Sequence, residues 1–164
     1  MVIASFVAGT VISGYIIQDS TLKLGRRYGG ALLMESVLLG LAVPLLQHNY
    51  QFGVYAASCA CGLQNAMAST YSGALVRTTH LSGMFTDLGI FLGHALRGLP
   101  VEWLRLRLCL LIISGFICGG IAGAASWPLL GYATLYFPCA LTGLTALLYG
   151  IMTVHKRRRA RFQV

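Results

Sequence analysis

Long apolar runs dominate the chain, in place of the alternating or amphipathic patterns of soluble domains. A helix needs about 20 mostly apolar residues to cross the roughly 30 Å hydrocarbon core of a bilayer. Five runs meet this requirement: residues 1–17, 30–46, 52–72, 108–125 and 129–154. The pattern predicts an all-α fold, a polytopic bundle of transmembrane helices that forms a single domain over residues 1–154. A basic tail is predicted at 155–164.

The charged residues are few, and the basic ones lie mainly at the ends of the apolar runs. The chain is 57% hydrophobic and 10% charged, with a formal net charge of +8. A basic chain can bind nucleic acid, but basic residues that flank apolar runs are typical of topology determinants. These residues are Lys23, Arg26, Arg27, Arg97, Arg105, Arg107, Lys156, Arg157, Arg158, Arg159 and Arg161. The expected partner is therefore the lipid bilayer and not a nucleic acid.

A sixth apolar segment, residues 81–96, is short and carries several polar side chains. If it crossed the membrane with the basic tail inside, the basic cluster at 23–27 would lie outside. If it enters and returns, every basic cluster lies on the cytoplasmic side, as the positive-inside rule favours. We therefore predict five spans plus one re-entrant or broken helix. The protein is expected in the plasma (inner) membrane with its C-terminus in the cytoplasm.

Two segments match without a gap at an offset of 110 residues: SFVAGTVISG at 5–14 and GFICGGIAGA at 115–124. Both carry small residues at every fourth position, a spacing that allows close approach of another membrane helix. These helix-packing candidates are Ser5, Gly9, Ser13, Gly115, Gly119 and Gly123. A weaker echo links 40–42 with 143–145. In the predicted topology the two copies have opposite orientations, which indicates a partial inverted repeat of the kind found in secondary transporters.

Small and polar residues line one face of the run at 52–72. Ser58, Gly62, Asn65 and Ser69 recur at steps of four and three, and Gln64 precedes the central Asn65. An amide inside a membrane helix requires hydrogen-bond partners. Two interpretations stay open: these groups hold helices together, or they line a polar pathway.

Titratable and hydroxyl groups are concentrated at 77–94, and Glu35 is the only acidic residue within a clean span. Three roles are open for Asp87 and Glu35: structural pairing with Arg77, proton or cation coupling with His80 as a neighbour, or simple exposure to water at the lipid headgroups. His80, Asp87 and His94 recur every seven residues, about 10.5 Å apart along a helix, too far to share one metal ion. We expect no metal and no cofactor. The pathway candidates are Glu35, Gln64, Asn65, Arg77, Thr78, Thr79, His80, Ser82, Gly83, Thr86 and Asp87.

The segments GLQNAMAS, VRTTHLSGMFTDLG, GFICGGIAGA and FVAG resemble the signature segments of the YoaK-like family. These are uncharacterised bacterial membrane proteins, classed as domain of unknown function 1275. The resemblance implies a membrane fold and small-molecule transport. This chain has Ser82 where the family commonly has threonine, and it lacks the first part of the family's duplicated unit. A homodimer that completes the site and a truncated product are both left open.

The leading hypothesis is a secondary transporter or channel-like protein for a small solute or ion. The alternative is a structural or assembly subunit of the membrane. An enzyme is not expected, because Ser82 and His80 lie two positions apart and would point to opposite faces of a helix.

Overall fold

The computed structural model describes the backbone of residues 1–17, 26–71 and 81–161, and the side chains of these except 26–27, 71 and 154–161. All regular structure in the described residues is helical, so the predicted all-α class is confirmed. The elements are α1 (Val2–Ile16), α2 (Arg26–Gln47), α3 (Gln51–Tyr71), α4 (Leu81–Leu96), α5 (Trp103–Leu130), the 3-10 helix η1 (Gly131–Leu135) and α6 (Tyr136–Arg161).

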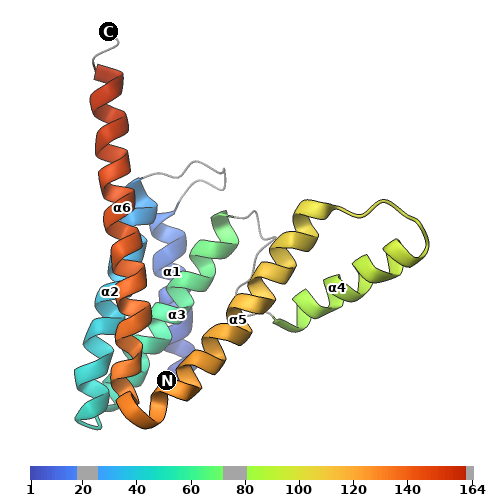
Figure 1. Ribbon diagram of the computed structural model, residues 1–164. Coiled ribbons are helices and arrows are strands. Elements are labelled where there is room, and N and C mark those ends of the chain that lie inside the picture. The colour runs from blue at the N-terminus through green and yellow to red at the C-terminus, as the bar shows by residue number, and fades with distance from the viewer. Residues whose placement is uncertain (18–25, 72–80, 162–164) are drawn as a thin grey trace.

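Four helices form a bundle. Helix α3 packs against both α1 and α2, and α6 packs along the other side of α2. Helices α1 and α2 scarcely touch each other, because α3 lies against both of them. Figure 1 shows the resulting order, with α6 antiparallel to α2.

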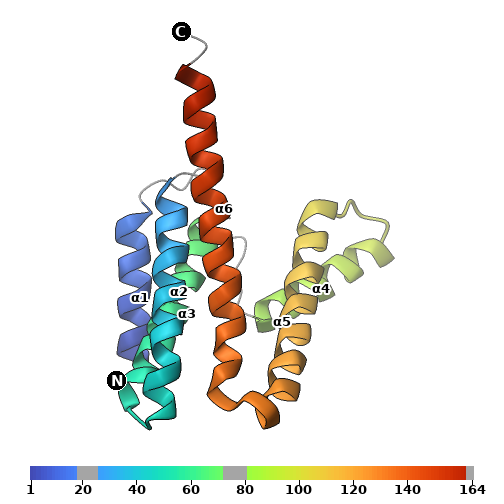
Figure 2. The same cartoon turned by 60° about the vertical axis from the view of Figure 1, so that its left-hand side comes forward.

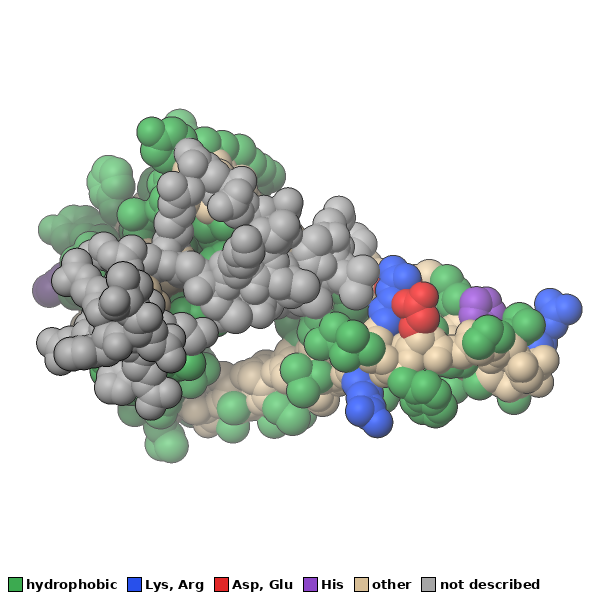
Figure 3. Space-filling model, turned by 90° about the horizontal axis from the view of Figure 1, so that it is seen from above, with side chains coloured by type: hydrophobic (Ala, Val, Ile, Leu, Met, Phe, Trp, Pro, Cys, Tyr) green, Lys and Arg blue, Asp and Glu red, His purple; other side chains and the backbone are tan. Residues whose placement is uncertain are grey.

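Helices α4 and α5 form a hairpin that stands apart from the bundle. Among the described elements, α4 contacts only α5, and α5 contacts only α4 and η1. Figure 2 shows α5 diverging from the bundle above η1. In the space-filling view from above, an opening separates the hairpin from the bundle (Figure 3).

The turns between helices rely on residues with positive φ. Asn49 (φ 58°) reverses the chain between α2 and α3, where the Tyr50 amide donates to the Leu45 carbonyl at 2.8 Å. Gly98 (φ 68°) ends α4, where the Leu99 amide donates to the His94 carbonyl at 2.9 Å. Gly131 (φ 51°) ends α5. Glycine and asparagine adopt this left-handed conformation at the lowest steric cost, so these positions determine where the helices stop.

The helix ends lie at two levels of the molecule. We call the upper end of Figure 1 the basic end: α1, α3 and α4 finish toward it, and α2 and α5 start from it. Met1, the turn at 48–50 and η1 lie at the opposite end. Helix α4 starts near mid-height and runs obliquely to the basic end, whereas α5 extends between both ends.

Two helices differ in extent from the sequence-based expectation. Helix α6 continues to Arg161, so the basic segment predicted as a separate tail is helical up to that residue. The sequence predicts a re-entrant or a broken helix for the segment 81–96. Helix α4 is continuous through Gly83, so it contains no break within 81–96. A glycine inside a helix costs only about 1 kcal/mol relative to alanine, which the surrounding apolar turns tolerate.

Candidate functional site

Glu35 lies inside the helical bundle. It is located on α2, its side chain is 3% exposed, and its Oε2 atom has no hydrogen-bond partner among the described residues. Ala31 and Leu39, one turn away on either side along the same face, are also buried. An acidic group in an apolar setting is costly, since its charge is not solvated. Glu35 is therefore the most unusual polar group in the described interior.

Glycines bring the backbones of α1 and α3 into direct contact. A Cβ atom added at Gly9 would collide with the backbone carbonyl of Cys59, and one added at Gly62 would collide with that of Phe6. The Ser58 hydroxyl donates to the carbonyl of Val2 at 2.9 Å. Both helices run toward the basic end, so α1 and α3 are parallel (Figure 1). Only residues without a Cβ atom permit this approach.

Ser13 continues the α1 face that meets α3. Its side chain is fully buried and its hydroxyl has no partner among the described residues. From the register of Gly9 against Cys59 and Leu63, Ser13 lies level with the next turn of α3. Gln64 and Asn65 are both half-buried on these turns of α3. The predicted amide pair therefore lies in the bundle at the level of Ser13.

Helices α2 and α6 meet through a reciprocal contact. The Ser36 hydroxyl donates to the Cys139 carbonyl at 2.8 Å, and the Cys139 thiol donates to the Ser36 carbonyl at 3.2 Å. A Cβ atom added at Gly40 would lie 3.4 Å from the Cys139 Sγ, and one at Gly143 would lie 2.8 Å from the Ser36 Oγ. At an offset of 103 residues, Ser36 corresponds to Cys139 and Gly40 to Gly143, so each contact made by one helix is repeated by the other. The sequence echo at 40–42 and 143–145 has the same offset.

The pathway candidates of α4 lie away from the bundle. Ser82 and Thr86 are exposed, Gly83 and Asp87 are half-buried, and the Thr86 hydroxyl donates to the Ser82 carbonyl at 3.0 Å within the helix. The face of α4 that meets α5 is apolar. Met84 is buried there with Cys109 and Ile113 of α5, and the Cys109 thiol donates to the Met84 carbonyl at 3.0 Å.

The described residues do not bring all predicted site residues together. Asp87 and Asn65 are not neighbours, because α4 contacts none of the described bundle helices. Arg77, Thr78, Thr79 and His80 lie outside the described residues, so their position relative to either group stays a prediction. The five cysteines are free thiols, and of these only Cys109 is buried.

The exterior of the helices is strongly apolar. Large hydrophobic side chains are exposed on every α-helix with described side chains, including Leu33 and Val37 of α2 and Leu110 and Leu111 of α5. Figure 3 shows this apolar surface on both the bundle and the hairpin. Soluble monomers rarely expose contiguous apolar patches larger than a few hundred Å². Arg97, Arg105 and Arg107 are exposed near the basic end.

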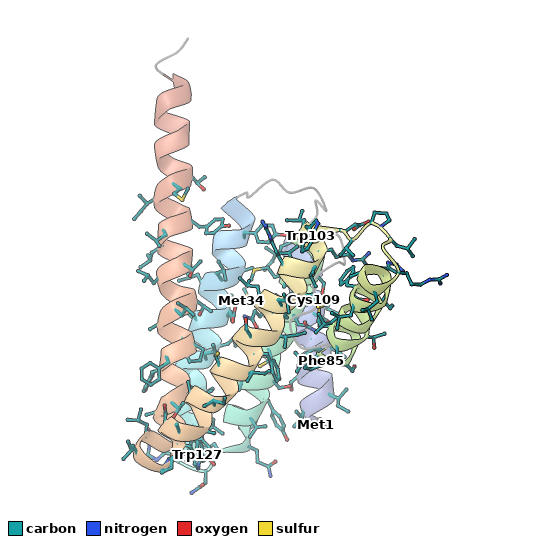
Figure 4. The ribbon with its side chains drawn as sticks, turned by 45° about the vertical axis from the view of Figure 1, so that its right-hand side comes forward. Met1, Met34, Phe85, Trp103, Cys109 and Trp127 are labelled. Atoms are coloured by element: carbon teal, nitrogen blue, oxygen red, sulfur yellow. The ribbon has the colours of Figure 1, made fainter. Side chains whose placement is uncertain are left out.

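Aromatic residues mark the two ends of α5, a signal that the sequence analysis did not use. Trp103 and Trp127 lie at opposite ends of the helix (Figure 4), about 36 Å apart by its rise per residue. The Trp127 ring packs edge-on against Tyr132 with centroids 5.2 Å apart. Tyr50 and Phe52 flank the first residue of α3, Tyr136 is the first residue of α6, and all three are exposed. Tryptophan and tyrosine are typically enriched at both membrane–water interfaces, where they form aromatic belts.

Two helical stretches among the described residues are long and apolar enough to cross a membrane. They are Tyr28–Gln47 and Trp103–Thr153, and the second contains the reversal at η1. Helices α1 and α4 are shorter apolar helices. This composition and this exposed apolar surface are typical of helical membrane proteins.

Comparison with known proteins adds the family. The profile of the proteins of unknown function DUF1275 matches residues 1–148, so the chain belongs to this family. No curated protein and no solved structure matches the chain.

Proposed function

We propose that this member of the DUF1275 family is an integral membrane protein that moves a small solute or ion across the plasma (inner) membrane. In this proposal it acts as a secondary transporter or channel-like protein. Helices α1, α2, α3, α5 and α6 cross the bilayer, and α4 lies partly within it and finishes toward the basic end.

The distribution of charge supports the orientation. The described arginines of the α4–α5 connection are exposed at the basic end, to which α6 also returns. The opposite end combines aromatic side chains with turns that lack Lys and Arg. Basic residues are retained on the cytoplasmic side. The basic end, with the C-terminus, is therefore assigned to the cytoplasm.

The buried carboxyl group of Glu35 carries the transport proposal. It lies in the middle of a candidate span, and one of its oxygens has no hydrogen-bond partner among the described residues. Ionisable groups within membrane helices mark proton relays and ion pathways, because a purely structural role can be filled at lower cost by an apolar residue. We assign Glu35 the role of a proton- or cation-coupling group. Ser13, Gln64 and Asn65, which lie at one level of the bundle, are proposed as further polar groups of the pathway.

Flux measurements in proteoliposomes test this function. The purified chain is reconstituted under an imposed proton gradient, and uptake of amino acids, sugars and monovalent ions is measured. We expect gradient-driven uptake of one class of solute, reduced to background in Glu35→Gln. The matched control is Glu102→Gln, which removes the exposed carboxyl group that precedes α5. Equal flux in Glu35→Gln and in the unchanged protein would remove the coupling role.

A structural or assembly role is the second candidate. It is favoured by the hydroxyl groups of Ser36 and Ser58, which donate to backbone carbonyls of neighbouring helices and thereby join them. Under this alternative, Glu35→Gln changes the stability of the protein but no flux. A folded protein that transports none of the tested solutes would favour this role.

A further inference from the structure

Helices α5 and α6 together present an uncovered face. No described element other than α4 and η1 contacts α5, and α5 and α6 do not contact each other. On α5, a Cβ atom added at Gly115, Gly119 or Gly123 would meet nothing within 4 Å. On α6, Leu141 and Leu148 flank Thr145 and are 68% and 52% exposed. This surface, which we call the α5–α6 face, consists of these six residues.

The first half of the chain contains the same elements in a covered state. Gly9 of α1 corresponds to Gly119 of α5 at the offset of 110 residues. Gly9 is buried against the backbone of α3, whereas Gly119 is exposed. Ser13 is likewise fully buried, whereas a Cβ atom added at its counterpart Gly123 would meet nothing within 4 Å. The same sequence motif is therefore packed in one copy and open in the other.

The second helices of the two halves show the same contrast. At the offset of 103 residues, at which α2 and α6 exchange their contacts, Thr145 corresponds to Ala42. Ala42 is fully buried, and a Cβ atom added at Gly53 of α3 would lie 3.0 Å from the Ala42 carbonyl oxygen. Thr145 lies between the exposed Leu141 and Leu148. Helix α3 thus packs against both α1 and α2, whereas no described α-helix packs against both α5 and α6.

The two halves also run in opposite directions. Helix α1 runs toward the basic end and α2 away from it, whereas α5 runs away from the basic end and α6 toward it (Figure 1). Together with the reciprocal contact of Ser36 and Cys139, this order relates the two helix pairs by an approximate two-fold axis between α2 and α6. A helix that relates to α5 and α6 as α3 relates to α1 and α2 would therefore run parallel to α5 and antiparallel to α3.

We propose that the α5–α6 face binds one separate transmembrane helix whose contact surface has the chemistry of α3. The occupant presents small residues four apart, as Ser58 and Gly62 do, to the glycines of α5. It presents apolar side chains to Leu141 and Leu148. Backbone-to-backbone approach through small residues supplies the packing that drives helix association in lipid, where burial of apolar surface supplies none.

A synthetic peptide with the sequence of α3, residues 51–71, serves as the probe helix. It carries a dansyl group at its C-terminus and is added to the full chain in lipid nanodiscs. Energy transfer is measured from the two tryptophans, Trp103 and Trp127, at opposite ends of α5. Within the protein, Cys59 of α3 lies against Gly9 of α1. If Cys59 of the parallel peptide lies against Gly119 in the same way, the dansyl group at the peptide C-terminus is near Trp127. Trp103, at the start of α5, is then about 36 Å farther from the dansyl group.

We expect saturable transfer that is lost in Trp127→Phe and retained in Trp103→Phe. Transfer is also lost with Gly119→Leu in the protein or Gly62→Leu in the peptide. Gly93→Leu is the matched control, because Gly93 is a helical glycine of α4 whose added Cβ atom would likewise meet nothing within 4 Å. Helicity by circular dichroism and monomer mass are measured for every variant, so that loss of transfer is attributed to the face and not to unfolding.

Three results would overturn the proposal. The first is the absence of saturable transfer to the folded protein. The second is transfer that survives Gly119→Leu, or that depends on Trp103 instead of Trp127. The third is a homodimer that forms without peptide and is lost in Gly119→Leu, because a second copy would then occupy the face.

Discussion

At the scale of single residues, identical side chains have different roles according to what approaches them. Gly9 is essential to the contact of α1 with α3, and Gly119 within the same motif touches nothing. Glu35 is buried in the bundle, whereas Asp87 is half-buried on a helix outside it. Residue type and spacing alone do not distinguish these positions. The distance to the backbone of the neighbouring helix distinguishes them.

The two matched glycines should differ in their effect on stability. We expect Gly9→Leu to lower the free energy of unfolding by about 3 kcal/mol, because the carbonyl of Cys59 cannot move without displacing α3. Gly119→Leu should change it by less than about 1 kcal/mol, since its surroundings are open and leucine favours helix. Denaturation by sodium dodecyl sulfate, followed by circular dichroism, measures both. Equal destabilisation would contradict the described packing of α1.

Ser36 offers a smaller test at the contact of α2 and α6. Ser36→Ala removes the hydroxyl that donates to the Cys139 carbonyl. Hydrogen bonds between membrane helices contribute about 0.6 to 2 kcal/mol, and we expect a loss in this range. Ser114→Ala is the control, because the Ser114 hydroxyl donates only within α5. The same denaturation experiment applies, and a loss no larger than that of the control would show that the contact contributes nothing.

At the scale of elements, α4 combines a covered apolar face with an uncovered face of small residues. Met84 and Phe91 are buried, whereas Ser82, Thr86 and Gly93 are exposed. Helix α4 is too short and too oblique to span the molecule from end to end. A polar segment at membrane depth is tolerated where protein or water surrounds it. The exposed face of α4 is therefore expected to border water.

Thiol labelling distinguishes water from lipid at exposed positions. In a chain with its five native cysteines replaced by serine, Thr86→Cys should react with a water-soluble maleimide in reconstituted membranes. Val37→Cys, on the exposed apolar side of α2, should not react, because lipid covers it. Rapid labelling at both positions would argue against a membrane environment for α2. Protection of both would place α4 in lipid or in a protein contact.

At the scale of the whole molecule, the bundle and the hairpin are joined through η1 and have different packing. The bundle contains the main group of buried apolar side chains, centred on Leu63 and Met67, and the hairpin contains a smaller group around Cys109. The bundle helices and α5 of the hairpin both extend between the basic end and the opposite end. Under the proposed function, the two parts therefore have the same membrane orientation.

The orientation is tested with single cysteines in intact cells. His48→Cys, in the turn opposite the basic end, should react with an impermeant reagent added outside. Arg97→Cys, at the basic end, should react only after the membrane is permeabilised. Reaction of Arg97→Cys in intact cells, with protection of His48→Cys, would reverse the assigned orientation.

The helices, the family and the distribution of charge at the helix ends could be predicted from the sequence alone. Each apolar run became a helix, because a backbone in an apolar environment must satisfy its own hydrogen bonds, and this requirement is local. Helix limits followed from local signals as well, such as Gly98 and Gly131. The small residues of α1 could be recognised as a packing stripe for the same reason, since helical spacing places them on one face.

Which of these helix faces are covered could not be predicted from the sequence and is seen only in the packing of the helices. The tertiary structure placed α3 on Gly9, left Gly119 open, buried Glu35 and paired Ser36 with Cys139, more than a hundred residues away. Packing between helices depends on the approach of backbones that are distant in the chain. Two copies of one motif therefore carry the same sequence signal and still differ in their contacts, because the neighbouring helix, and not the motif, determines whether the face is buried.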